Sequence, residues 1–148
     1  MVTARILVQE EVEVQYNLRG SLGQRDEIEV LTAASAWQLV RYLQAEEIHL
    51  VLFEHWMPDM LGDELVEKIR RLPFNQEVPV FVLGTELSPS ARERYRKLEP
   101  VTLIEGQISE DELHKLVLEK LSFTWRQVER IAVKVPVRIK CQNKVLEG

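Results

Sequence analysis

The sequence predicts an α/β fold in which five parallel strands form one doubly wound sheet, with helices covering both faces. Between residues 5 and 121, short apolar runs alternate five times with segments of helical periodicity. Two of the runs, Ile48–Phe53 and Val78–Leu83, are apolar almost throughout, as strands are when both faces are covered. Such alternation is typical of a (βα)5 sheet, which has a crevice at the carboxyl ends of its strands.

The predicted strands are rich in Val, Ile and Leu. The first stops at the pair Glu10 and Glu11, and the second alternates apolar and polar residues with the period of a strand. In chain order, the five strands are Arg5–Gln9, Glu27–Ala33, Ile48–Phe53, Val78–Leu83 and Val101–Ile104.

The predicted helices are recognised by apolar stripes and by residues that begin or end a helix. Ser35 and Ser88 are suitable N-caps, Pro73 stops a helix, and Ser109 with Glu112 forms a capping box. The stripes are Val14, Leu18 and Leu22 in residues 11–22, Trp37, Val40 and Leu43 in residues 35–44, and Leu65, Ile69 and Leu72 in residues 61–72. Two more helices are expected over residues 88–98 and 109–121.

The length of 148 residues and the 45% apolar content suit one domain with a core and a short extension. No window holds the ~18 uninterrupted apolar residues of a membrane helix, and the first residues lack the apolar core of a signal peptide. We therefore expect a cytoplasmic protein with no membrane partner. The single cysteine, Cys141, excludes an internal disulfide, and we expect it to pack as a small hydrophobe.

The charge is distributed unevenly along the chain. Residues 1–123 hold 13 Lys and Arg against 22 Asp and Glu, whereas residues 124–148 hold 6 against 2. The acidic body would repel phosphate backbones, which argues against a nucleic-acid partner. We therefore divide the chain into a body, residues 1–123, and a basic extension, residues 124–148.

Residues 4–121 resemble a receiver domain of the bacterial response-regulator family. The resemblance is carried by the acidic pair Glu10 and Glu11, by Glu54 followed two residues later by Met57 and Pro58, and by the order of the later strands. It implies a flavodoxin-like topology. Members of the family phosphorylate themselves on an aspartate, with a magnesium ion held by the acidic pair, a hydroxyl residue and a lysine at the phosphoryl group, and an aromatic that rotates inward.

This chain departs from the family at each of these positions. Glu54 stands in place of the phosphoacceptor aspartate, and its extra methylene displaces the carboxylate by roughly an ångström, enough to cost ~10²-fold in a positioned reaction. Glu10 and Glu11 occupy the metal-binding pair with arms long enough to move any metal from its usual place. The other positions hold Gly84 for the hydroxyl residue, Leu103 for the aromatic and Gly106 for the lysine, with Thr85 one residue beyond Gly84 and Gln107 in place of the family's proline.

The departures predict a degenerate receiver, or pseudo-receiver, that is not an enzyme and holds no cofactor. Three carboxylates without the lysine raise one another's pKa, so they either extend into water, bind a cation, or leave Glu54 protonated or hydrogen-bonded. Glu54 could hold the domain in one state as a phosphoaspartate does, although an inert residue is the better interpretation. The alternative is a metal-binding or still phosphorylatable receiver that uses His55 or Asp59; His49 and His114 have no metal-binding spacing.

The expected partners are proteins, because the family uses the surface formed by residues 90–98, the fifth strand and residues 111–121 to dimerise or bind partners. Opposite charges on this surface could meet across a two-fold axis in a homodimer, or could all be solvated. The basic side chains are Arg92, Arg94, Arg96 and Lys97, and the acidic ones are Glu110, Asp111 and Glu119.

The basic extension resembles the start of a PilZ domain, the bacterial receptor fold for cyclic di-GMP. Apolar residues alternate from Ile131 to Cys141, as in a strand, and Arg126 and Arg130 precede them with the RxxxR spacing. In that family the two arginines would bind the phosphates and guanine faces of the ligand. We expect the nucleotide to bind only when the rest of such a domain is present; otherwise the two arginines are solvated and the strand serves assembly.

Overall fold

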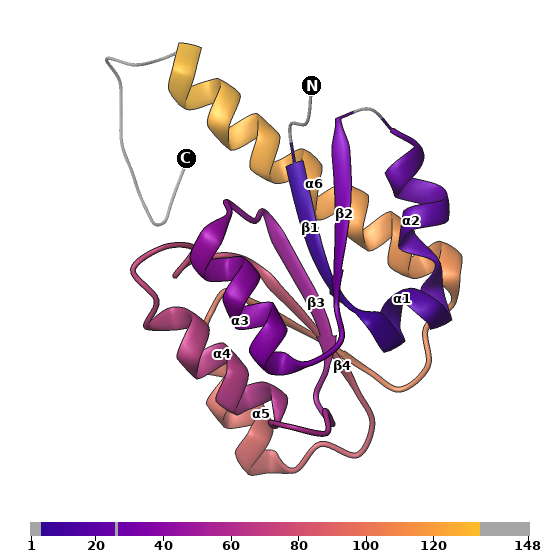
Figure 1. Ribbon diagram of the computed structural model, residues 1–148, viewed down its shortest axis with the longest axis vertical. Coiled ribbons are helices and arrows are strands. Elements are labelled where there is room, and N and C mark those ends of the chain that lie inside the picture. Colours follow the sequence, from indigo (N-terminus) through magenta and orange to yellow (C-terminus); the bar gives the residue numbers. More distant parts are fainter. Residues whose placement is uncertain (1–3, 26, 134–148) are drawn as a thin grey trace. The chain divides into compact units, whose positions relative to one another are not determined.

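The computed structural model describes residues 4–25 and 27–133, of which residues 122–133 are described by their backbone alone. Five parallel strands form one sheet in the order β2-β1-β3-β4-β5 (Figure 1), which confirms the predicted fold class and topology. The strands are β1 (Ala4–Gln9), β2 (Ile28–Ala33), β3 (Leu50–Glu54), β4 (Val80–Gly84) and β5 (Val101–Glu105). The helices are α1 (Glu10–Tyr16), α2 (Leu18–Ser21), η1 (Leu22–Gln24), α3 (Ala36–Ala45), α4 (Gly62–Arg70), α5 (Pro89–Arg96) and α6 (Glu110–Val133).

Both faces of the central strands are buried. On one face, Leu7, Val51 and Phe53 belong to a core cluster that also contains Leu43 of α3 and Ile69 of α4. The alternate positions of the same strands are also buried, and they include Ile6, Val8, Leu50 and Leu52. Successive side chains of a strand point to opposite faces, so this burial explains the almost continuous apolar runs in the sequence.

The helix predicted over residues 11–22 is in fact two short helices separated by Asn17. This residue adopts the left-handed conformation, with φ 51°, and its amide N–H donates to the carbonyl of Glu13. The side chain of Asn17 then accepts a hydrogen bond from the amide of Gly20 and caps α2. Val14, predicted in the apolar stripe, is 80% exposed, because the buried side of α1 is formed by Val12 and Tyr16.

The predicted stripe of α3 was wrong at Trp37, which is 52% exposed. Ser35 caps the helix as expected, since its hydroxyl accepts from the amide of Gln38. The buried residues are Ala36, Leu39, Val40 and Leu43, so the stripe is centred one position away from the indole. Trp37 is partly covered by Lys68 of α4, whose ammonium lies 5.2 Å from the ring centroid.

The capping box predicted at residues 109–112 is present at the start of α6. The Ser109 hydroxyl accepts from the amide of Glu112, and the Glu112 carboxylate accepts from the amide of Ser109. Likewise, Ser88 caps α5 by accepting from the amide of Ala91, with Pro89 in the first turn. These two helix starts could be read from the sequence because the caps are local.

The chain divides into two compact units, residues 1–116 and 117–148, at a point within α6. Where the sequence predicts a linker and then a strand from Ile131, the helix continues to Val133, and Arg126 and Arg130 lie within it. Extending a capped helix costs little, whereas a lone strand has no neighbour to pair with, so the helix is favoured over residues 124–133. The rest of the predicted strand, with Cys141, lies outside the described residues. Among the helices described, none is long and apolar enough to span a membrane.

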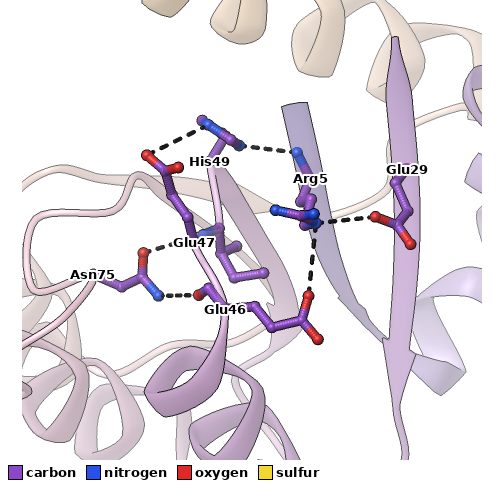
Figure 2. A network of polar contacts seen from close by, with 7 residues as sticks. Arg5, Glu29, Glu46, Glu47, His49 and Asn75 are labelled. Carbon is purple, nitrogen blue, oxygen red and sulfur yellow. Dashed lines mark hydrogen bonds and ion pairs between the residues drawn. The ribbon is translucent and has the colours of Figure 1, made fainter. Parts of the chain in front are cut away.

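A polar network joins the amino-terminal ends of β1, β2 and β3 (Figure 2). Arg5 donates through Nε to Glu29 at 3.0 Å, and the same atom lies 3.6 Å from Glu46. The amide of Arg5 donates to Nδ1 of His49 at 2.9 Å, and burial lowers the pKa of this histidine. Asn75 donates to the carbonyl of Glu46 and fixes the turn between α3 and β3. His49 therefore has a structural role at the end of the sheet opposite to Glu54.

Candidate functional site

Glu54 is the last residue of β3 and lies at the carboxyl end of the sheet, where the sequence places it. Its amide N–H donates at 2.8 Å to the side-chain oxygen of Gln9, the last residue of β1. The β1–β3 ladder ends at the pair Val8 and Leu52, so the Gln9 side chain supplies the acceptor that backbone pairing no longer provides. Gln9 is only 1% exposed, and sequence reasoning missed its role. A polar residue that ends an apolar strand was the available signal.

The carboxyl group of Glu54 lies close to that of Glu11. Burial, the negative charge of Glu11 and a hydrogen bond with Glu11 all raise the pKa of Glu54. The side-chain amide of Gln9 also donates to Glu11, at 3.4 Å. Burial and the charge of Glu54 raise the pKa of the Tyr16 hydroxyl in turn. The site is therefore a carboxyl pair bordered by a tyrosine, in which like charges oppose ionisation of Glu54.

Glu10 and Glu11, predicted as a metal-binding pair, begin α1 and are both exposed. Glu11 is the one that acts on Glu54. Within the described residues, no group of three acidic, histidine or cysteine side chains is arranged to hold a metal ion.

Of the three predicted switch positions, Gly84 ends β4, Leu103 lies within β5 and Gly106 follows β5, and two of them favour glycine sterically. A Cβ atom on Gly84 would lie 3.2 Å from Cβ of His55 and 3.3 Å from Cδ2 of Leu87, closer than most side chains tolerate. Gly106 has φ 79°, a left-handed conformation that a lysine would adopt only with strain. Leu103 is half-buried in β5. A hydroxyl residue at 84 and a lysine at 106 would therefore not fit this backbone without adjustment.

Trp56 connects the loop after β3 to the loop after β4. Its indole N–H donates to the carbonyl of Thr85 at 3.2 Å, and its ring meets the edge of His55 with centroids 4.6 Å apart. A bridge between Trp56 and Leu61 and a hydrogen bond from Gly62 to the carbonyl of His55 close the loop on itself. The indole remains 54% exposed, although these contacts hold it in place.

His55 and Asp59, the alternative reactive residues, are both held elsewhere. The His55 ring is 2% exposed and its Nδ1 lies 2.6 Å from the hydroxyl of Tyr95 in α5. Burial lowers the pKa of His55, and the charge of Asp63 opposes that shift. The Asp59 carboxylate accepts from the amides of Ala36 and Trp37 at the start of α3. Neither side chain is directed at the crevice as a free nucleophile.

An open groove of about 400 Å³ lies between α5 and β5, on the surface predicted to bind partners. Four of its lining residues are charged and the others are apolar or aromatic. The lining residues are Pro89, Arg92, Glu93, Tyr95, Arg96, Glu99, Val101 and Leu103. A groove of this composition can accept a side chain or a helix from another protein.

The arginines of this surface form ion pairs with acidic residues of the same chain. Arg92 donates to both carboxylate oxygens of Glu105, with a shortest distance of 2.8 Å. Arg94 donates to the buried Asp63 at 3.2 Å and to Glu67 at 2.9 Å. Arg96 pairs with Glu93 along α5. Arg92, Arg94 and Arg96 thus have acidic partners within the chain, which are not the Glu110, Asp111 and Glu119 considered from the sequence.

The remaining residues of the predicted surface are less informative. Lys97, Glu110 and Asp111 are exposed, and Glu119 falls in the second unit. His114, at the start of α6, is buried and its Nε2 donates to the carbonyl of Tyr16 at 2.7 Å. That bond satisfies a carbonyl in the last turn of α1, so His114 is structural.

Comparison with known proteins agrees with this architecture. A family model described as the response regulator receiver domain matches residues 6–118. A CheY-like receiver domain protein from Methanospirillum hungatei is 22% identical, with a TM-score of 0.70 over 84% of this chain and 98% of that one. The chemotaxis response regulator CheY4 of Vibrio cholerae is 20% identical, with a TM-score of 0.67 over 80% of this chain and 99% of that one.

A third solved structure is the non-phosphorylated HemR receiver domain from Leptospira biflexa. It is 22% identical, with a TM-score of 0.63 over 80% of this chain and 91% of that one. No curated protein sequence matches the chain. Identities this low establish the fold, whereas the family model covers most of the chain. The five-stranded sheet, the acidic residues at its carboxyl edge and the matched residues together place the chain in the response regulator receiver domain family.

Proposed function

We propose that residues 1–123 form a pseudo-receiver, a signalling module that binds other proteins in the cytoplasm without being phosphorylated. The main support is the state of Glu54 in the acceptor position. Its amide is bonded to Gln9, its carboxyl is hydrogen-bonded with Glu11, and its pKa is raised. A phosphoacceptor must instead be ionised and directed at the incoming phosphoryl group.

The surroundings of Glu54 support the same proposal. A receiver transfers a phosphoryl group by positioning it and stabilising its charge with a metal ion and a cation. Here Gly84 and Gly106 occupy the hydroxyl and lysine positions, and the Trp56 indole is bonded to Thr85. In the family, the hydroxyl residue and the lysine both stabilise the transition state of phosphoryl transfer. We therefore expect the loss of both to abolish the reaction rather than slow it.

The groove between α5 and β5 is the surface that we assign to partner binding. The two arginines that line it, Arg92 and Arg96, are already paired with Glu105 and Glu93, so a partner would meet pre-paired and nearly neutral side chains. Pre-ordered side chains lower the entropy cost of binding. Homodimerisation through this surface, or through the basic extension, is one form that such an interaction can take.

We also propose that, in a longer protein, the module is coupled to a PilZ domain that binds cyclic di-GMP. The support is the spacing of Arg126 and Arg130 and the alternating apolar residues that follow them. Planar guanidinium groups suit both the phosphates and the guanine faces of that ligand. The basic charge of residues 124–148 against the acidic body favours the same assignment.

The proposal is tested by incubation of the protein with acetyl phosphate and magnesium, followed by intact-mass measurement. We expect no phosphoryl adduct, while a conventional receiver domain treated in parallel gains one. The variant Glu54→Asp should also stay unmodified, because Gly84 and Gly106 still occupy the hydroxyl and lysine positions. A stoichiometric adduct on the unmodified sequence would establish the alternative, a receiver that is still phosphorylatable.

A further inference from the structure

We propose that the buried His55–Tyr95 hydrogen bond is a fixed tether, which holds α5 and the groove between α5 and β5 in one position whatever happens at Glu54. The inference deepens the proposed function, on which it rests, because it names the contact that sets the state of the partner-binding groove. The two residues are 40 positions apart in the chain, and their polar atoms lie 2.6 Å apart.

The His55 end of the tether is rigid. Its amide donates to the carbonyl of Leu83 in β4 at 2.8 Å, and its carbonyl accepts from the amide of Gly62 at 2.8 Å. The histidine is thus held by a neighbouring strand and by the start of α4. It also directly follows Glu54, the residue in the acceptor position. A displacement at the end of β3 would therefore meet a histidine whose backbone is already fixed.

The Tyr95 end is buried in a site shaped for its hydroxyl group. Tyr95 is 1% exposed, and its ring lies edge-on to His55 with centroids 5.7 Å apart. A Cβ atom added to Gly62 would lie 2.3 Å from the hydroxyl oxygen, so only glycine leaves room for it. Burial, with the charge of Asp63, raises the pKa of Tyr95 and keeps the hydroxyl neutral.

Tyr95 also lines the groove between α5 and β5, together with Val101 and Leu103. Because Tyr95 is almost fully buried, it supports the wall of the groove from beneath, and the position of that wall depends on the bond to His55. A second link, from Arg94 to Asp63 and Glu67, holds the same helix to α4. To change the groove, α5 would have to move, which would break the His55–Tyr95 bond and leave two buried polar groups unpaired.

The tether occupies the structural position of the family's switch. In phosphorylated receivers, a hydroxyl residue after the fourth strand and an aromatic on the fifth carry the signal from acceptor to surface, and here those residues are Gly84 and Leu103. A single buried hydrogen bond connects the same two regions in this chain. A bond of this kind shifts a two-state equilibrium by about 10- to 100-fold when it is removed.

Amide hydrogen exchange on the full chain tests the tether. In Tyr95→Phe, which removes one oxygen atom, we expect the amides of α5 to exchange about 10- to 100-fold faster, while β1, β2 and α3 keep their rates. Tyr16→Phe is the matched control: it also removes a buried hydroxyl, and it should leave α5 unchanged. Unchanged exchange in α5, or equal acceleration throughout the molecule, would overturn the proposal.

A conservative variant distinguishes the hydrogen bond from packing. Asparagine can place its side-chain oxygen near the position of Nδ1, so His55→Asn should return α5 exchange towards the wild-type rate, whereas His55→Leu should not. If both variants accelerate amide exchange in α5 equally, the His55–Tyr95 hydrogen bond is not what holds α5 in place. If His55→Leu does not fold, the comparison of Tyr95→Phe with His55→Asn still decides the question.

A further arm separates this proposal from the proposed function. Exchange of the wild-type chain is measured with acetyl phosphate and magnesium, and α5 should show no change. A response of α5 to the phosphodonor would contradict both the phosphorylation-independent function and a tether indifferent to Glu54. An inert α5 in the wild type, combined with no effect of Tyr95→Phe, would remove the tether alone.

Discussion

At the scale of single residues, the site is defined by the groups that surround Glu54 and by their effect on its pKa. Gln9 holds its amide, Glu11 faces its carboxyl, and burial adds to the cost of the charge. The folded-state pKa of Glu54 is therefore higher than its unfolded value of 4.5. A raised pKa means that the folded protein is favoured while Glu54 is protonated, and that this contribution is lost as the pH rises through the folded-state pKa.

The variant Glu54→Gln should accordingly raise the free energy of unfolding at pH 7 to 8, because it removes a charge that the folded state disfavours. The gain should be a fraction of a kcal/mol to about 1 kcal/mol, since solvent screens a half-exposed carboxylate. It should disappear near pH 4, where Glu54 is protonated in both states. Urea unfolding over this pH range measures it, with Glu10→Gln as the exposed control. Destabilisation at pH 7 would mean that a cation stabilises the charge.

At the scale of elements, the break at Asn17 shows how one residue sets the register of a helical segment. The left-handed backbone separates α1 from α2, and the Glu13 carboxylate accepts from the amides of Leu18 and Arg19 to begin α2. Leu18 and Leu22 of the predicted stripe are buried, whereas in α1 the buried residues are Val12 and Tyr16 instead of Val14.

The variant Asn17→Ala should lower the free energy of unfolding by about 1–3 kcal/mol, because alanine loses the cap and resists the positive φ. Asn17→Gly is the matched control: it tolerates the backbone and loses only the cap, so the loss should be about 1 kcal/mol or less. Urea unfolding monitored by circular dichroism compares them. Equal losses in the two variants would show that the conformation of Asn17 is not what holds α1 and α2 in place.

At the scale of the whole molecule, the acidic body has the receiver fold and the basic extension follows it. The extension begins as a continuation of α6 rather than as the predicted linker and strand. A helix that leaves a receiver domain without a break is suited to connect it to another module, because helical segments transmit position along their length. The proposed partner module is the PilZ domain.

This chain should bind cyclic di-GMP negligibly in calorimetry, whereas a longer protein that contains a whole PilZ domain should bind it. In that protein, Arg126→Ala or Arg130→Ala should each weaken binding by about one to two decades, as expected for charge-assisted hydrogen bonds. Arg92→Ala is the control, because Arg92 pairs with Glu105 and lies outside the extension. If both substitutions in the extension leave the affinity for cyclic di-GMP unchanged, the assignment of the RxxxR arginines to ligand binding is ruled out.

The sequence was sufficient for the sheet and for the caps at Ser35, Ser88 and Ser109, because periodicity and capping are local signals, and the resemblance to the receiver family supplied the strand order. It was also sufficient to place Glu54 and Gly84 at the carboxyl ends of neighbouring strands, since parallel strands bring these ends together. It could not reveal Gln9, Trp56 or the His55–Tyr95 bond, because each depends on contacts between distant segments. The break at Asn17 was missed because an asparagine in a loose apolar pattern does not by itself indicate a positive φ.

The crowding at Gly84 bears on any attempt to restore the family's hydroxyl residue. A β-carbon at that position would lie 3.2 Å from the β-carbon of His55, which is itself fixed by Tyr95 and by two backbone hydrogen bonds. A threonine introduced there by one substitution would meet this fixed neighbour and the side chain of Leu87, 3.3 Å away. Restoring the hydroxyl therefore calls for coordinated substitutions, in which residues 55 and 95 change together with residue 84.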